Sequence, residues 1–157
     1  MRKIGLLFTF LLSSSGLTYA DSPKGTWAMA DRKFIVSVDR CGTNLCGRIV
    51  GLKEPTYSNG RKKIDRQNEN EALRSRPLMG LGLLLNMRPA GSNTWKGAIY
   101  NPDDGKTYGA TLSLNGSVMK VQGCVAGIFC KTVNFTRLAN TPSSMAAEQV
   151  RLKAVSE

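Results

Sequence analysis

The sequence predicts an all-β protein, an eight-stranded antiparallel up-and-down β-barrel with one long loop between the third and fourth strands. Three observations lead to this fold class. Short runs of β-branched and aromatic residues alternate with turn residues from position 25 to position 138, as is typical of an all-β chain. Most of these runs are joined by connections short enough for hairpins. A sheet of sequential hairpins leaves two exposed edges unless it closes on itself, so we expect the first and last strands to pair.

The expected strands follow the runs of strand-forming residues, and together they make one domain at positions 21–138. They are Gly25 to Ala30, Phe34 to Asp39, Cys46 to Leu52, Leu81 to Met87, Thr94 to Tyr100, Lys106 to Leu114, Val118 to Val125 and Cys130 to Leu138.

The short connections carry residues that suit tight turns. Residues 31–33 (Asp-Arg-Lys) join the first two strands, and residues 101–105 (Asn-Pro-Asp-Asp-Gly) join the fifth and sixth. Asn115-Gly116 lies between the sixth and seventh strands, where both residue types tolerate the positive φ angles of a hairpin turn.

The connection at residues 53–80 is much longer than the others. It contains Asn59-Gly60 and the basic run Arg61-Lys62-Lys63. Loops of this length inside a compact domain are uncommon, and they usually act as lids or binding loops or lack fixed structure. We expect a short helical turn at about residues 69–74.

Both ends of the chain lie outside the predicted barrel. In residues 1–20, Arg2 and Lys3 precede an apolar run and Ala20 supplies a small residue for cleavage, which is the layout of a secretory signal peptide. A membrane anchor would need about 20 apolar residues, and this run is far shorter. We therefore expect an exported protein with no transmembrane segment after signal cleavage. At residues 139–157 we expect either a C-terminal helix or a tail without regular structure.

The chain is strongly basic. Removing residues 1–20, which include Arg2 and Lys3, leaves 20 basic and 11 acidic side chains, a net charge of +9. Such a surface favours anionic neighbours, for example lipid headgroups, cell-wall polymers or acidic proteins. The simpler alternative is a well-solvated basic surface without a dedicated partner.

The four cysteines, Cys41, Cys46, Cys124 and Cys130, indicate disulfides, because an even number in an exported protein usually does. The first spacing would just suit a zinc site, but the second is too wide, and the redox motif Cys-x-x-Cys is absent. Residues facing each other across a hairpin have Cα atoms about 4.5–5.5 Å apart, within reach of a disulfide. We favour the local pairs Cys41–Cys46 and Cys124–Cys130 over the two long-range pairings.

Several motifs along the chain resemble one known family. They are Gly25-Thr26-Trp27, Cys41-Gly42 with Leu45-Cys46-Gly47-Arg48-Ile49-Val50, Leu73-Arg74 with Arg76-Pro77-Leu78, Ile99-Tyr100-Asn101-Pro102 with Asp104-Gly105-Lys106-Thr107-Tyr108, and Gly123-Cys124 with Cys130-Lys131. Over residues 25–138 the chain is similar to the small exported bacterial proteins of domain of unknown function family 2147. The resemblance implies a lipocalin-like, calycin-type barrel in a periplasmic or secreted bacterial protein, and it implies no agreed biochemical activity.

Closure of the barrel would bring Trp27, near the start of the first strand, beside Arg137, near the end of the last. A guanidinium over an indole face contributes about 0.5–2 kcal/mol. This pair resembles the one that plugs the floor of lipocalin barrels, so we expect a structural role for it; contact with a ligand is the alternative.

The strand directions place the connections after the first, third, fifth and seventh strands at one end of the barrel. We interpret this end as the mouth through which a small apolar or amphiphilic ligand enters. The candidate ligand-binding residues are Arg74, Arg76, Tyr100, Asn101 and Tyr108. Either arginine, or the basic run at 61–63, would steer an acid group.

Two alternatives to this interpretation stay open. Arg74 and Arg76 would instead anchor the long loop, through backbone carbonyls or through Asp103 and Asp104. The barrel is also small, so inward side chains would then fill its interior completely.

Catalysis is not expected. The chain has no histidine, which is the usual proton shuttle near neutral pH, and it has no nucleophile elbow, metal-ligand cluster or phosphate loop. Asp103 and Asp104 are adjacent in a turn, so they cannot face each other as an acid and base pair. No cofactor and no metal are predicted.

The alternative to a ligand container is an interaction protein of the cell envelope. In that hypothesis Arg61, Lys62 and Lys63 contact an anionic envelope component or a protein partner. Nucleic acid is not an expected partner, because the basic run has no interleaved aromatic residues and an exported protein is in the wrong compartment.

Overall fold

The computed structural model describes residues 22–138. The expected signal peptide at 1–20 and the C-terminal helix or tail at 139–157 lie outside the described residues. Between positions 22 and 138 there is no helix with the length and apolar character needed to cross a membrane.

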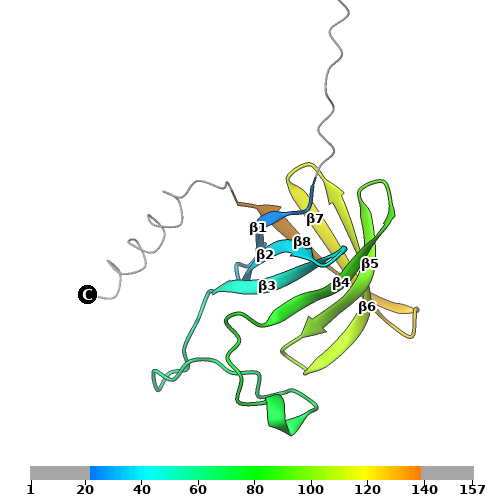
Figure 1. Cartoon of the computed structure of the whole chain (residues 1–157). Helices are drawn as coiled ribbons and strands as arrows, with labels where there is room; N and C mark the ends of the chain where they lie inside the picture. Colours follow the sequence, from blue (N-terminus) through cyan, green and yellow to red (C-terminus); the bar gives the residue numbers. More distant parts are fainter. Residues whose placement is uncertain (1–21, 139–157) are drawn as a thin grey trace, which may run out of the picture.

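The strands follow one another along the chain and form a closed barrel (Figure 1). They are β1 (Gly25–Met29), β2 (Phe34–Cys41), β3 (Asn44–Leu52), β4 (Gly82–Gly91), β5 (Thr94–Asn101), β6 (Lys106–Asn115), β7 (Val118–Val125) and β8 (Phe129–Arg137). Each strand pairs antiparallel with the next, and β1 pairs with β8, with Met29 opposite Phe135. The predicted eight-stranded up-and-down barrel is confirmed, and its closure removes the two exposed sheet edges.

The packed core includes the end of the barrel where β1 begins and β8 ends, and it continues along the barrel to Phe34 of β2 and Tyr100 of β5. On β2, the alternate residues Phe34, Val36 and Val38 are buried, as expected for a strand with one face inside. The largest fully buried side chains are Trp27, Phe135, Ile49, Leu84, Met87, Leu112 and Met119. Burial of each contributes about 1.5–3 kcal/mol, so this cluster dominates the stability of the fold.

Arg137 lies over the indole of Trp27 at this end, with its guanidinium carbon 4.2 Å from the ring centroid. The two residues are also directly opposite in the β1–β8 register. Trp27 Nε1 donates to the carbonyl of Pro23 at 2.8 Å, and Arg137 Nη1 donates to the carbonyl of Lys24 at 2.7 Å. The predicted contact is present, and it ties the incoming segment across the floor of the barrel.

Both local disulfides are present, Cys41–Cys46 and Cys124–Cys130. Cys124 and Cys130 are directly opposite each other in the β7–β8 register, with Cα atoms 4.1 Å apart. Cys41 and Cys46 are not opposite, since Cys41 pairs with Asn44, and their Cα atoms lie 5.7 Å apart on a diagonal. This hairpin is tighter than predicted, because β3 begins at Asn44 rather than at Cys46.

β4 is longer than predicted and continues to Gly91, past Pro89. Proline lacks the N–H that a regular ladder needs, and such residues are found at edges or irregularities of sheets. The β4–β5 register shifts between Leu85 and Arg88 and again between Pro89 and Gly91, and Asn86 has a φ of 49°. These irregularities allow the strand to continue through the proline.

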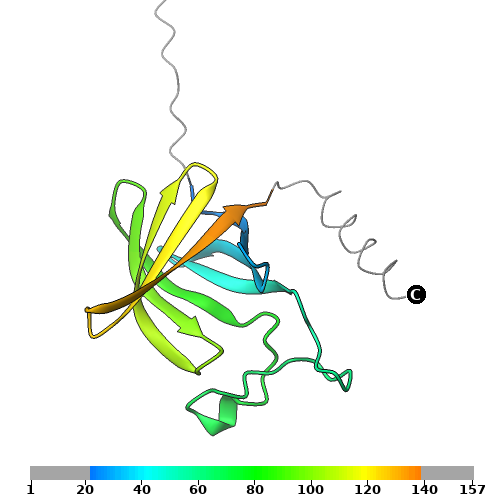
Figure 2. The same cartoon turned by 180° about the vertical axis from the view of Figure 1, so that it is seen from behind.

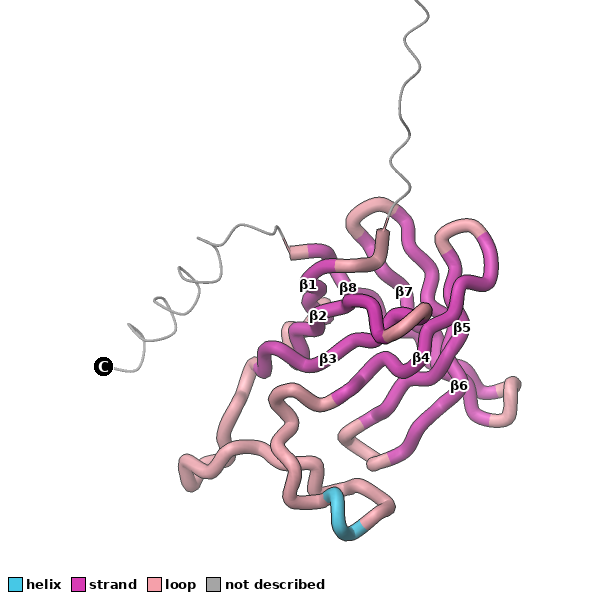
Figure 3. Tube along the Cα trace, viewed as in Figure 1, coloured by secondary structure: helices cyan, strands magenta, loops and turns pink. Residues whose placement is uncertain are grey.

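The connection between β3 and β4 is the only described stretch that contains helix, a single 3-10 turn η1 at Glu71–Leu73 (Figure 3). The side chain of Asn70 accepts from the N–H of Ala72 and caps this turn. The helical turn expected at residues 69–74 is therefore confirmed. Isolated bridges Thr56–Lys62 and Ile64–Pro77 give the rest of the loop its shape.

Candidate functional site

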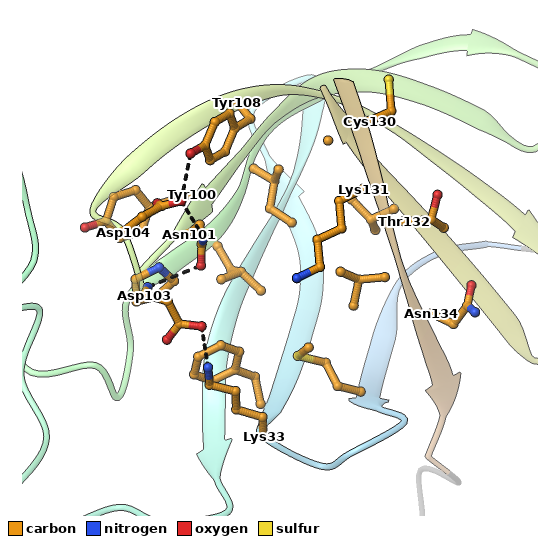
Figure 4. Close-up of a pocket in the computed structure, with 18 of the residues that line it drawn as sticks. Lys33, Tyr100, Asn101, Asp103, Asp104, Tyr108, Cys130, Lys131, Thr132 and Asn134 are labelled. Carbon is orange, nitrogen blue, oxygen red and sulfur yellow. Dashed lines mark hydrogen bonds and ion pairs between the residues drawn. The ribbon is translucent and has the colours of Figure 1, made fainter. Parts of the chain in front are cut away.

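A cavity of about 1020 Å³ opens at the end of the barrel opposite the packed floor (Figure 4). The β1–β2, β5–β6 and β7–β8 connections meet there, and residues from all three line it. Sites for small molecules usually measure about 300–1,000 Å³. The space is therefore large enough to receive a small organic ligand.

The inner wall of this cavity is apolar. It is formed by the strand residues Met29, Leu83, Ile99, Val121, Val133 and Phe135. Val121 and Phe135 also belong to the packed core, so the cavity ends where the core begins. Nearer the mouth, β7 contributes Gly123, whose absent side chain would lie 3.0 Å from Ile99 Cγ2. The barrel is thus filled up to Val121 and hollow above it.

One side of the mouth is polar and is built by the β5–β6 turn. The Asp104 carboxylate accepts hydrogen bonds from the Tyr108 hydroxyl at 2.7 Å and from Asn101 Nδ2 at 2.8 Å. Burial acts to raise the pKa of Asp104, but these bonds and the N–H of Lys106 outweigh it and leave the pKa below its usual value. The bond to Asp104, followed by burial, raises the pKa of Tyr108. Asp104 is therefore an ionised group with its acceptors already in use at neutral pH.

A second ion pair joins two connections across the mouth. Lys33, at the end of the β1–β2 turn, pairs with Asp103 of the β5–β6 turn (Figure 4). The Lys33 N–H also donates to the side chain of Asp31 at 2.9 Å. Both members of the pair line the large cavity, so their charges are neutralised at its edge.

Lys131 is a basic residue whose side chain extends into the open space. It extends from β8 with its ammonium group directed into the cavity (Figure 4). It is solvent-exposed, and across residues 22–138 no hydrogen bond or ion pair to its side chain is found. Lys131 was not among the predicted site residues, although alternation along β8 with the inward residues Val133 and Phe135 predicts the same orientation.

The β7–β8 tip forms an apolar part of the rim. Val125, Ile128 and Phe129 line the cavity and yet are 51%, 77% and 76% exposed. The hairpin projects beyond its neighbours and is visible from behind the barrel (Figure 2). The Cys124–Cys130 disulfide lies at its base and holds this tip in place.

A second cavity of about 530 Å³ lies between the long loop and the barrel. Tyr57, Lys63, Ile64 and Arg66 line it from the loop side. It shares Asp31, Lys33, Phe34, Pro102 and Asp103 with the large cavity. The Lys33–Asp103 pair therefore stands between the two spaces.

A buried carboxylate fixes the long loop to β5. Asp65 is 0% exposed, and its oxygens accept from Tyr100 Oη at 2.5 Å, Asn68 Nδ2 at 2.9 Å and Arg76 Nε at 2.8 Å. Burial first, and then the bond to Asp65, raises the pKa of Tyr100. Arg74 Nε donates to the carbonyl of Asn68 at 2.8 Å, which holds the next part of the loop.

These contacts separate the predicted ligand-binding residues into two groups. Tyr100, Asn101 and Tyr108 all line the large cavity. Arg74 and Arg76 lie in the long loop, outside the lining of both cavities, and their guanidinium groups bond to Asn68, Glu71 and Asp65.

The basic run of the long loop is also divided. Arg61 and Lys62 are exposed, whereas the Lys63 ammonium pairs with Glu54 at 2.9 Å and is partly buried. The backbone of Arg61 accepts from the N–H of Tyr57 at 2.8 Å, so the run lies in a small hairpin. The part of the run that faces solvent therefore consists of two cationic side chains.

In the described part of the chain, no group of three or more potential protein ligands is arranged to hold a metal ion. The carboxylates at the mouth instead accept hydrogen bonds from neighbouring side chains and backbone. The arrangement suits an organic molecule with a substantial apolar part.

Comparisons with known proteins agree with this architecture. A family model described as "Uncharacterized protein conserved in bacteria (DUF2147)" matches residues 25–137. Among solved structures, the protein HP1028 from Helicobacter pylori, described as belonging to the lipocalin family, is similar with a TM-score of 0.63 and 24% identity. The match covers 74% of this chain and 83% of the other. A search of curated proteins finds no match.

Proposed function

The chain belongs to the bacterial family DUF2147, and from this premise and its lipocalin-like barrel we propose that it is a non-catalytic protein that binds a small apolar or amphiphilic molecule at the barrel mouth. The observation that carries the proposal is the hollow upper half of a closed barrel whose lower half is packed. Apolar walls with a few polar groups at one side are typical of small-molecule sites.

The exposed tip of the β7–β8 hairpin supports the same proposal. Ile128 and Phe129 are large apolar side chains that water surrounds in the absence of a ligand. Their position on the cavity rim means that an apolar ligand entering the mouth would cover part of their surface. Burial of apolar surface contributes about 25 cal/mol per Å², so this contact favours binding.

We further propose that the protein is exported and acts in the periplasm or outside the cell. Two disulfides fit a protein that folds in an oxidising compartment. Binding rather than catalysis is favoured because the chain lacks histidine and the mouth carboxylate of Asp104 already accepts several hydrogen bonds.

Binding of a neutral apolar dye, N-phenylnaphthylamine, whose fluorescence rises when it leaves water, tests the binding proposal. We expect saturable fluorescence enhancement with the wild-type protein. Val133→Trp places an indole in the cavity and is expected to weaken dye binding at least about tenfold, which corresponds to about 1.4 kcal/mol. Gln122→Trp adds the same indole to an exposed position of β7 outside the cavity lining and serves as the matched control.

The comparison of the two variants also locates the dye. Binding that is unaffected by Val133→Trp, or equally affected by Gln122→Trp, would show that the dye adheres to the surface and would contradict a ligand site in the lumen. Near-ultraviolet circular dichroism checks that both variants keep the packed core.

A further inference from the structure

We propose that the ligand is an anionic amphiphile, an alkyl chain ending in an acid group, and that the acid group pairs with the ammonium of Lys131 inside the cavity. This inference rests on the proposed function and assigns it a ligand class. It also places the recognition of the acid group on β8, and not on the arginines of the long loop, whose guanidinium groups already bond within that loop.

The register of the β7–β8 hairpin places Lys131 among the residues that line the cavity. Lys131 is directly opposite Gly123, and both line the cavity. Gly123 has no side chain that could contact Lys131, and the place that its Cβ would take lies 3.0 Å from Ile99 Cγ2. Figure 4 shows the Lys131 ammonium group directed away from its own strand and into the cavity.

The other charged groups of the cavity are already engaged. Lys33 pairs with Asp103, Asp31 accepts from the backbone of Lys33, and Asp104 accepts from Tyr108. The charged residues that line the cavity all belong to the described part of the chain. Among them, Lys131 is the one whose side chain makes none of these contacts. An acid group entering the cavity would find in Lys131 a cation without an ion-pair partner, whereas the charged carboxylates of Asp31 and Asp104 lie in the β1–β2 and β5–β6 connections at the mouth.

The order of residues along β8 orients the ligand. The strand runs from the mouth toward the floor, and Lys131 is followed on the same face by Val133 and Phe135. These residues extend the lining about 13 Å along the strand, at about 3.3 Å per residue. An acid group at Lys131 would therefore place the alkyl chain deeper, against Val133, Phe135 and Val121 of the apolar wall.

The test compares decanoic acid, decanol and decylamine, which share one alkyl chain and differ in headgroup charge, by displacement of the neutral dye at neutral pH. We expect the wild-type protein to bind the acid at least about tenfold more tightly than the alcohol, since a hydrogen bond to a charged group contributes about 1.5–3 kcal/mol. Lys131→Met keeps a long apolar side chain and is expected to abolish this preference while leaving decanol affinity within about twofold. Lys120→Met, at an exposed position of the adjacent β7, is the control and should keep the preference.

The possible outcomes distinguish a failure of the role of Lys131 from a failure of the ligand-binding function. If none of the three compounds displaces the dye and the dye does not bind, the ligand-binding function fails. If decanol and decanoic acid bind equally to the wild-type protein, if decylamine binds most tightly, or if Lys131→Met retains the preference for the acid, then the role of Lys131 is wrong while binding in the lumen stands.

Discussion

A single buried carboxylate, Asp65, decides how the longest loop of the molecule meets the barrel. It lies in a loop of mostly polar composition and is nevertheless 0% exposed. Isolated buried charges are unfavourable, and Asp65 is stabilised because Tyr100, Asn68 and Arg76 all donate to it. The same network explains why Arg76 bonds within the loop.

Removal of one donor measures the strength of this anchor. Tyr100→Phe deletes the hydroxyl that joins β5 to the loop and leaves Asp65 with one fewer hydrogen bond. We expect the free energy of unfolding to fall by about 1–3 kcal/mol, the usual range when a buried polar group loses its partner. Urea denaturation monitored by tryptophan fluorescence gives this value.

Tyr108→Phe is the matched control, because its hydroxyl also donates to a carboxylate, Asp104, but near the solvent. We expect a loss below about 1 kcal/mol there, since water replaces the deleted bond. Equal losses in the two variants would contradict a special role for Asp65 in fixing the loop.

The β5–β6 turn and the long loop meet at a glycine. Gly105 has a φ of 72°, and a Cβ built on it would lie 1.8 Å from the carbonyl oxygen of Gln67. No side chain fits there without moving one of the two backbones. The glycine of the turn therefore serves the contact between two connections as well as the turn itself.

Gly105→Ala is expected to destabilise the protein more than Gly116→Ala. Gly116, in the β6–β7 turn, also has a positive φ, 56°, but a Cβ there meets nothing within 4 Å. In Gly116→Ala, only the strain of an alanine at positive φ lowers the free energy of unfolding, by about 1 kcal/mol. Gly105→Ala has the same strain and adds the clash with the Gln67 backbone. Hydrogen exchange should show faster exchange in residues 65–76 for Gly105→Ala alone; unchanged exchange there would contradict the contact.

Local sequence patterns predict which face of a strand is buried better than they predict where the strand ends. Alternation along Phe34, Val36 and Val38 predicts an inward face, and the structure has these residues buried. The pattern fails at Pro89, where a strand continues past a residue that normally ends one. The reason is the irregular β4–β5 register, which depends on a partner strand that a local window does not contain.

Closure of the sheet is the property on which the rest of the molecule depends. The β1–β8 seam is short, because β1 has only 5 residues, and it is reinforced by Arg137, which contacts Trp27 and the carbonyl of Lys24. The seam joins residues from the two ends of the described chain. The stability of this seam therefore determines whether β1 and β8 stay paired and continue to enclose the cavity.

Arg137→Leu is expected to lower the free energy of unfolding by about 1–2 kcal/mol, since it removes the cation–π contact and the hydrogen bond to Lys24. Amide hydrogens of β1 and β8 should exchange faster than those of β4 and β5. Arg88→Leu, at an exposed position of β4, is the control and should change stability by less than about 0.5 kcal/mol. A uniform increase in exchange across all strands would argue against a local role at the seam.

Local signals in the chain were enough for the number and order of the strands, the up-and-down topology, the short helical turn and both disulfides. The reason is that hairpins and local cysteine pairs join residues close in sequence. The sequence also proposed Tyr100, Asn101 and Tyr108 as ligand-binding residues; all three line the cavity, and their contact with a ligand stays a prediction.

Local signals left open whether the lumen is filled and whether Arg74 and Arg76 bind a ligand or anchor the long loop. They also did not single out Lys131 as an unpaired cation in the cavity. Whether a barrel is filled depends on the sum of the side chains that all eight strands point inward, and these strands come from the whole length of the described chain. Which charges are neutralised depends likewise on pairs such as Lys33 with Asp103, which are 70 residues apart, and Arg76 with Asp65, which the fold of the long loop brings together. Only the folded register brings those partners within bonding distance.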